Sequence, residues 1–160
     1  EARDDERPVV DAADLSHPAD TQAERKGFRI LWDAKQEVAY PSMSIVTRRK
    51  WVAEDRDTVM RMVKAHVEAI HYLKANKEFS MKVLGKYLKT NDRELLESSY
   101  EIYRKDFISV PYPITQGLQP TYEYVAAQRP EIWNQKPEAF MDSSFIAELE
   151  KSGFIKNLSR

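Results

Sequence analysis

Apolar and polar positions follow two different patterns along the chain, one typical of strands and one typical of helices. Residues 9–13 and 28–31 are short, largely apolar runs, and residues 41–47 alternate Met43, Ile45 and Thr47 with Ser44 and Val46. Short runs of this kind, rich in β-branched residues, favour strands. Between the first two runs, residues 19–26 predict a helix, which Gly27 ends because glycine tolerates left-handed backbone. We therefore predict a β-turn-α-β unit followed by a third strand.

The rest of the chain has helical periodicity. Asp55 is the predicted N-cap of a helix that runs to about residue 76. Its apolar face is predicted to consist of Val59, Val63, His66, Ile70 and Leu73. Further helices are expected over residues 80–88, after a cap at Asn91, from Pro120, and between a cap at Asp142 and a stop at Gly153. A small α/β portion thus precedes a helical remainder, which is unbalanced for a self-contained doubly wound domain.

Composition and charge narrow the possible partners. The 25 basic and 26 acidic residues nearly cancel, and the longest basic run is Arg48-Arg49-Lys50, so we expect no nucleic-acid partner. No apolar run approaches the roughly 20 residues of a membrane-spanning helix, so we expect no transmembrane segment. The chain has no cysteine, which excludes disulfides, thiolate metal sites and cysteine nucleophiles.

The turn between the first two predicted strands is the strongest candidate site. It contains Asp14, Ser16 and His17, and turns at the carboxyl ends of strands are where α/β proteins bind ligands. Ser16 and His17 do not make a nucleophile and base, because adjacent side chains on extended backbone point to opposite faces. As turn residues, Ser and Pro also have a purely structural interpretation.

Neither metal nor cofactor chemistry is predicted. His66 and His71 are five residues apart on one helix and cannot share a metal as an i,i+4 pair can, so we expect His66 to be a hydrogen-bonded structural residue. No glycine-rich phosphate loop or dinucleotide fingerprint exists among the four glycines. No pair of carboxylates stands out for acid-base work, so we expect no enzymatic activity.

Three stretches together resemble a known protein family. They are DAADLSHPADTQAERKGFRIL, YPSMSIVTRRKWVAEDRDTVMRMVKAHVEAIHYLKANKE and MDSSFIAELEKSGFI. Their order and spacing resemble the nitrate/sulfonate/taurine-type solute-binding proteins of bacterial ABC importers. In that family the long helix opens with Asn-Pro-Asp/Glu, whereas this chain has Asp55-Arg56-Asp57 and lacks the proline.

The resemblance implies an α/β fold, namely the C-terminal half of a two-lobed type II periplasmic-binding-protein-like fold, helix-rich with a few short strands. Residues 1–8 would be a frayed segment, residues 9–40 the end of the second lobe, and residues 41–160 a hinge return strand and C-terminal helical region. The first half would lie outside this sequence.

The same resemblance implies a function in transport. The chain would capture a small polar or anionic organic solute in a cleft between lobes and present it to the permease and ATPase subunits, at the periplasm or the outer face of the cell membrane. The cleft-facing residues would be Asp14, Ser16 and His17, with Tyr40 and Ser42 near the hinge. No cofactor is implied.

Two alternatives stay open at this point. Relatives of this fold in thiamine-precursor biosynthesis are enzymes, but they use a cysteine-rich motif that this chain lacks. A helical interaction module would account for the long amphipathic helices but not for the three predicted strands.

Overall fold

A computed structural model describes residues 11–33, 43–115 and 118–158. The chain divides into two compact units, residues 1–32 (unit 1) and 33–160 (unit 2), which are treated separately below. The domain boundary predicted between residues 40 and 41 lies outside the described residues.

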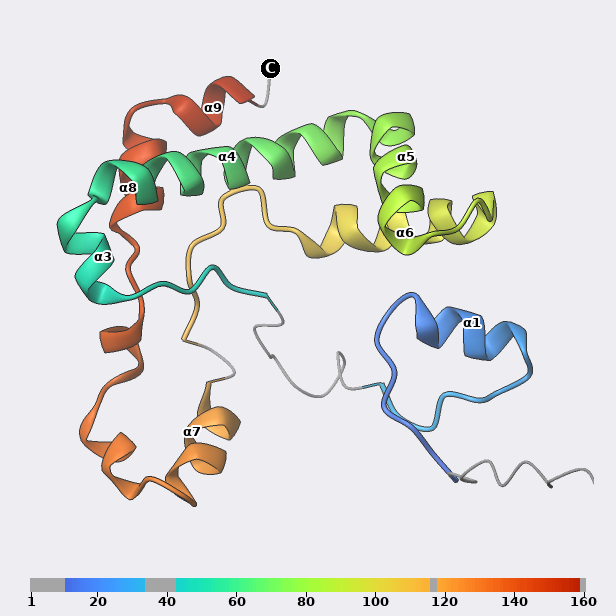
Figure 1. The fold of residues 1–160 in the computed structure, drawn as a ribbon, viewed down its shortest axis with the longest axis horizontal. Coiled ribbons are helices and arrows are strands. Elements are labelled where there is room, and N and C mark those ends of the chain that lie inside the picture. The colour runs from blue at the N-terminus through green and yellow to red at the C-terminus, as the bar shows by residue number, and fades with distance from the viewer. Residues whose placement is uncertain (1–10, 34–42, 116–117, 159–160) are drawn as a thin grey trace, which may run out of the picture. The chain divides into compact units, whose positions relative to one another are not determined.

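Helices account for 65% of the described residues. Unit 1 carries α1 (Ala19–Arg25). In unit 2 the chain forms the helices shown in Figure 1, which are α3 (Arg49–Glu54), α4 (Arg56–Ala75), α5 (Lys77–Leu88), α6 (Arg93–Asp106), α7 (Gln119–Ala126), α8 (Ser144–Lys151) and α9 (Phe154–Leu158), with the 3-10 helices η1 (Pro130–Asn134) and η2 (Pro137–Phe140) between α7 and α8.

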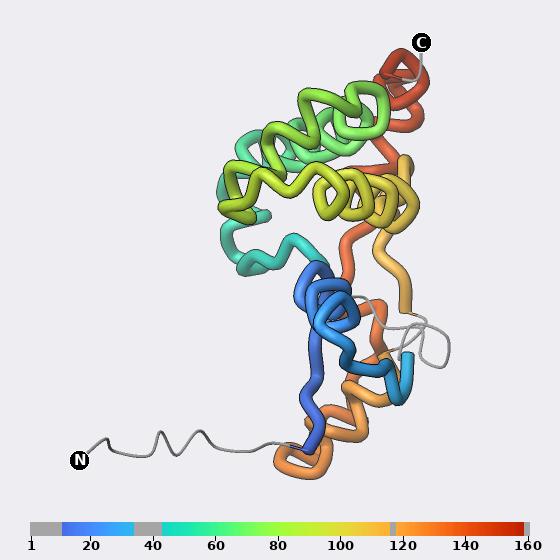
Figure 2. The backbone as a smooth tube through the Cα atoms, turned by 90° about the vertical axis from the view of Figure 1, so that its right-hand side faces the viewer, coloured from blue at the N-terminus to red at the C-terminus, as the bar shows by residue number. Residues whose placement is uncertain are grey.

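The predicted α/β architecture is wrong, because the described residues contain no strand or sheet. Residues 11–13, 28–31 and 43–47 have irregular backbone without helical coils (Figure 2), while residues 9–10 and 41–42 lie outside the described ranges. The chain is therefore not a type II periplasmic-binding-protein half in this structure. The physical reason is that a strand is stable only when a second strand satisfies its backbone groups, whatever its own propensity.

One apolar core forms where α8 and α9 pack against α4 (Figure 1). Its buried members are Val67, Ile146, Leu149 and Ile155. Val67 is fully buried, and α8 places Ile146 and Leu149 three residues apart on the face toward it. Short helices such as α8 are marginal alone, so this shared burial is what stabilises them.

A second core joins α5 and α6, with Met81, Leu96 and Tyr100 buried. The Tyr100 hydroxyl donates to the Lys74 carbonyl oxygen at 3.1 Å, which ties α6 to the end of α4. Gly85 lets the two helices approach, because a Cβ there would lie 3.0 Å from the Thr90 carbonyl oxygen and 3.3 Å from Leu96 Cδ1. Glycine at position 85 is thus a packing requirement.

Among the predicted helix caps and stops, several are confirmed and one is wrong. The Asp55 carboxylate accepts the Thr58 N–H at 3.1 Å, as an N-cap does. Hydrogen bonding with the Thr58 side chain, and then with its backbone N–H, lowers the pKa of Asp55. Gly27 and Gly153 both have positive φ, at 88° and 77°. The cap predicted at Asn91 is wrong, since its neighbour Asp92 accepts the Leu95 N–H at 3.0 Å.

The predicted structural role of His66 is wrong. His66 is exposed, whereas His71 is 9% exposed and its Nε2 donates to the Ser109 carbonyl oxygen at 2.9 Å. The buried stripe passes through Val67 rather than His66, one residue further along the helix. His71 is therefore the structural histidine, and it holds the segment after α6 against α4.

Candidate functional site

The predicted site residue His17 belongs to a compact polar cluster at the start of α1. His17 Nδ1 lies 3.2 Å from Asp20 Oδ1 and 3.2 Å from Thr21 Oγ1. Asp20 Oδ1 also accepts the Thr21 N–H at 2.6 Å, and the Ser16 carbonyl oxygen accepts the Ala19 N–H at 2.9 Å. Three side chains one turn apart therefore share hydrogen bonds, because residues i, i+3 and i+4 lie on one side of a helical turn.

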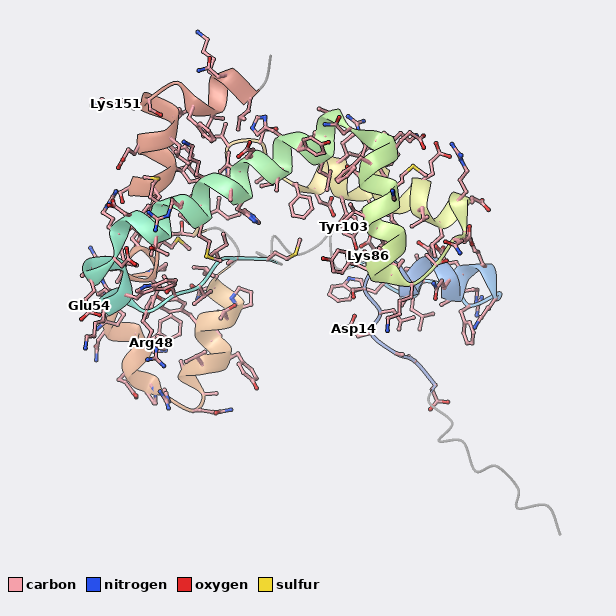
Figure 3. The ribbon with its side chains drawn as sticks, turned by 45° about the horizontal axis from the view of Figure 1, so that its top comes forward. Asp14, Arg48, Glu54, Lys86, Tyr103 and Lys151 are labelled. Carbon is pink, nitrogen blue, oxygen red and sulfur yellow. The ribbon has the colours of Figure 1, made fainter. Side chains whose placement is uncertain are left out.

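The other predicted site residues differ in how they are placed. Asp14 and Ser16 are exposed, and Asp14 lies on the non-helical segment that leads into α1 (Figure 3). The Asp14 carboxylate and the Ser16 hydroxyl make no hydrogen bond or ion pair with the part of the chain that the structure describes. Tyr40 and Ser42 lie outside the described residues.

This cluster suits binding better than nucleophilic attack. The Ser16 hydroxyl makes no hydrogen bond with the described residues, whereas the His17 imidazole contacts Asp20 and Thr21. An imidazole next to a carboxylate and a hydroxyl offers both donors and acceptors to a polar molecule. Because Asp20 already supplies a negative charge beside His17, the cluster favours a neutral or zwitterionic polar group over a simple anion.

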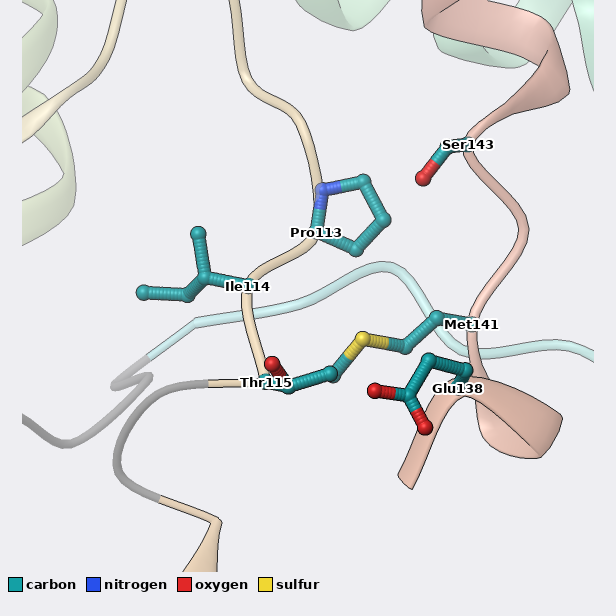
Figure 4. A pocket seen from close by; sticks show the side chains of 6 residues that line it. All are labelled: Pro113, Ile114, Thr115, Glu138, Met141 and Ser143. Carbon is teal, nitrogen blue, oxygen red and sulfur yellow. The ribbon is translucent and has the colours of Figure 1, made fainter. Parts of the chain in front are cut away.

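Unit 2 contains a hollow of about 620 Å³ that the sequence did not predict. It lies between the extended segment after α6 and the segment around η2 (Figure 4). Its lining residues are Pro113, Ile114, Thr115, Glu138, Met141 and Ser143. We call it the Glu138 hollow. Apolar walls with a few polar groups are the usual composition of a small-molecule site.

Aromatic side chains pack beside the Glu138 hollow. The Tyr122 ring lies 5.8 Å from the Trp133 ring and 6.4 Å from the Phe140 ring, centroid to centroid. Tyr122 is 7% exposed, and its buried hydroxyl has no hydrogen-bond partner among the described residues. Burial raises the pKa of this hydroxyl, and the negative charge of Glu138 raises it further.

A second hollow, of about 440 Å³, lies between α5 and α6. Its charged lining consists of Lys82, Lys86, Arg93 and Glu78, and Arg93 lies 3.5 Å from Glu78 in an exposed ion pair. Lys86 lies in the last turn of α5, where a cation interacts favourably with the helix dipole. Lys86 and the paired Arg93 therefore have a structural explanation, and this hollow is the weaker candidate.

The described residues contain neither a metal-binding cluster nor a membrane-spanning helix. No group of three or more histidine, aspartate or glutamate side chains is placed to hold a metal ion in residues 11–33, 43–115 and 118–158. Within these same ranges, every helix is too short or too polar to cross a membrane.

Comparison with known proteins adds no relative. Neither a protein-family model, nor a curated protein, nor a solved structure matches this chain. Function must therefore be argued from the chain's own residues.

Sequence reasoning found one member of the His17 cluster and missed the other two. The spacing His17, Asp20, Thr21 is i, i+3, i+4, and the predicted helix start would have been enough to bring them together. The Glu138 hollow gave no such signal, because Thr115, Glu138 and Ser143 come from separate segments joined only by the fold.

Proposed function

We propose that this chain is the solute-binding component of an ABC importer and that it binds a small polar organic solute near the start of α1. Two observations support the proposal. The first is the order and spacing of the three stretches that resemble solute-binding proteins. The second is the polar cluster of His17, Asp20 and Thr21, with Asp14 and Ser16 exposed beside it.

The His17 cluster is the observation that carries the proposal. Its polar side-chain atoms lie 3.2 to 3.3 Å from one another, and the Thr21 backbone N–H donates to Asp20 Oδ1 at 2.6 Å, so a ligand would meet preorganised groups. The adjacent exposed hydroxyl of Ser16 adds a donor and acceptor that the described residues do not use. Binding without covalent chemistry is all that these groups require.

Calorimetric titration tests this function. The probes are taurine, nitrate, uracil and benzoate, added separately to the full chain. We expect one of them to bind saturably and His17→Ala to weaken that binding by about tenfold, the value of one or two lost hydrogen bonds.

His66→Ala is the matched control, because His66 is an exposed histidine on α4. It should leave the affinity within about twofold. If none of the four probes binds, or if both variants bind equally well, the proposed site is wrong.

A helical interaction module is a second candidate, and exposed apolar side chains favour it. Leu31 is 76% exposed, Val46 86% and Phe28 69%. Exposed apolar surface of this kind marks association sites when it is contiguous. Sedimentation velocity distinguishes the candidates, since concentration-dependent association that Val46→Thr abolishes would favour the interaction module.

A further inference from the structure

The Glu138 hollow holds polar side chains that the fold itself does not use. Thr115, Glu138 and Ser143 line it, and none of their side chains makes a hydrogen bond or ion pair with the described residues. Figure 4 shows all three around the same space, with Met141 extending across it. Together they offer one carboxylate and two hydroxyls, and the carboxylate only accepts hydrogen bonds.

Glu138 makes no ion pair with the part of the chain that the structure describes. Two arginines contact residues next to the lining but bind other groups: the Arg49 guanidinium donates to the Ala139 carbonyl oxygen at 2.7 Å, and the Arg56 guanidinium lies 3.0 Å from the Glu148 carboxylate. The negative charge of Glu138 acts on the buried Tyr122 hydroxyl, which also lacks a hydrogen-bond partner within the described ranges. A cation in the hollow would offset the charge that now acts on this phenol.

The walls decide what kind of cation fits. Pro113, Ile114 and Met141 are apolar, and the volume of about 620 Å³ lies within the range of small-ligand sites. A metal ion would not use apolar walls, and it requires more oxygen ligands than one carboxylate and two hydroxyls. A protonated amine with an apolar body uses all of them, since its N–H groups donate to the carboxylate and the hydroxyl oxygens.

We propose that the Glu138 hollow binds a small organic ammonium ion, with the ammonium group on Glu138, Thr115 and Ser143 and its hydrocarbon part against Pro113, Ile114 and Met141. All residues of this site belong to unit 2, whereas the His17 cluster belongs to unit 1. Its existence does not depend on the proposed transport function.

Benzylamine is the probe that tests the proposal, and benzyl alcohol is the uncharged analogue used as its control. Two-dimensional ¹H–¹⁵N NMR of the full chain at pH 7.5 would follow the backbone amides of Thr115, Glu138 and Ser143. We expect benzylamine to shift them saturably with a Kd in the low millimolar range, and benzyl alcohol to bind at least about fivefold more weakly. This factor corresponds to one ion pair about 4 Å long in a solvent-open site.

Glu138→Gln keeps the side-chain shape and removes the charge, so it should weaken benzylamine binding by about fivefold. Glu131→Gln is the matched control, an exposed glutamate on η1, and should change the Kd by less than twofold. The proposal is overturned if benzylamine does not saturate by 50 mM, if the alcohol binds equally well, or if both variants lose affinity equally. The comparison of the two probes on the unmodified chain remains decisive even if Glu138→Gln fails to fold.

Discussion

The α4 core and the segment 43–47 contain similar apolar side chains in opposite environments. Val67 is 0% exposed between α4, α8 and α9, whereas Val46 is 86% exposed on backbone with no regular structure. The difference is in how each kind of element satisfies its backbone. A helix pairs its own N–H and C=O groups and needs a partner only for one face, but a strand needs a partner for its backbone as well.

Truncation of a side chain in the α4 core should lower the free energy of unfolding more than the other substitutions below. Leu149→Ala removes buried methyl groups between α8 and α4 and leaves a cavity, so we expect the free energy of unfolding to fall by about 2 to 4 kcal/mol. Val46→Ala should change it by less than about 0.5 kcal/mol, because that side chain is exposed. Urea denaturation of the full chain measures both. Equal losses would mean that Val46 packs against something.

Substitution of Gly85 should lower the free energy of unfolding by a smaller amount. In Gly85→Ala the new Cβ meets the Thr90 carbonyl oxygen at 3.0 Å, and overpacking of this kind costs about 1 to 3 kcal/mol. Alanine recovers about 1 kcal/mol of helix propensity. The net result should be a loss of about 1 kcal/mol in the same denaturation experiment, and a gain would show that the Thr90 loop does not pack on α5.

The smallest change in stability is expected from the Asp55 cap of α4, and this change depends on pH. Hydrogen bonding by Thr58 lowers the pKa of Asp55 below its usual 3.8. A lowered folded-state pKa means that Asp55 adds stability above pH 3.8 and loses it as the pH falls through the folded value. Asp55→Asn keeps the capping oxygen and should remove this pH dependence. Melting curves from pH 7 to pH 2.5 would show a steeper loss for the unmodified chain, and parallel curves would contradict the assignment.

Local rules explain which parts of the fold the sequence predicted correctly. The α4 helix with its Asp55 cap and the stops at Gly27 and Gly153 depend on neighbours within four residues, and the structure confirms all of them. The His66 prediction was wrong by a single helical position, because a stripe traced at steps of three or four can pass through residue 66 or 67.

The features that the sequence did not predict depend on contacts between residues far apart in the chain. Residues 28–31 and 43–47 have strand-like composition, but no sequence rule states whether a partner strand is present, so their predicted pairing was wrong. The Glu138 hollow could not be predicted from the sequence either, because residues 113–115 and 138–143 meet only through the packing of unit 2. The predicted roles of Tyr40 and Ser42 stay predictions.

Residue-resolved hydrogen–deuterium exchange of the full chain tests the contrast between the two regions most directly. We predict slow exchange in the centre of α4, around Val67 and Ile70, and exchange close to that of an unstructured peptide in residues 29–31 and 43–47. Protection of amides within residues 43–47, comparable with that of α4, would contradict the account, because it would require a backbone partner for this segment.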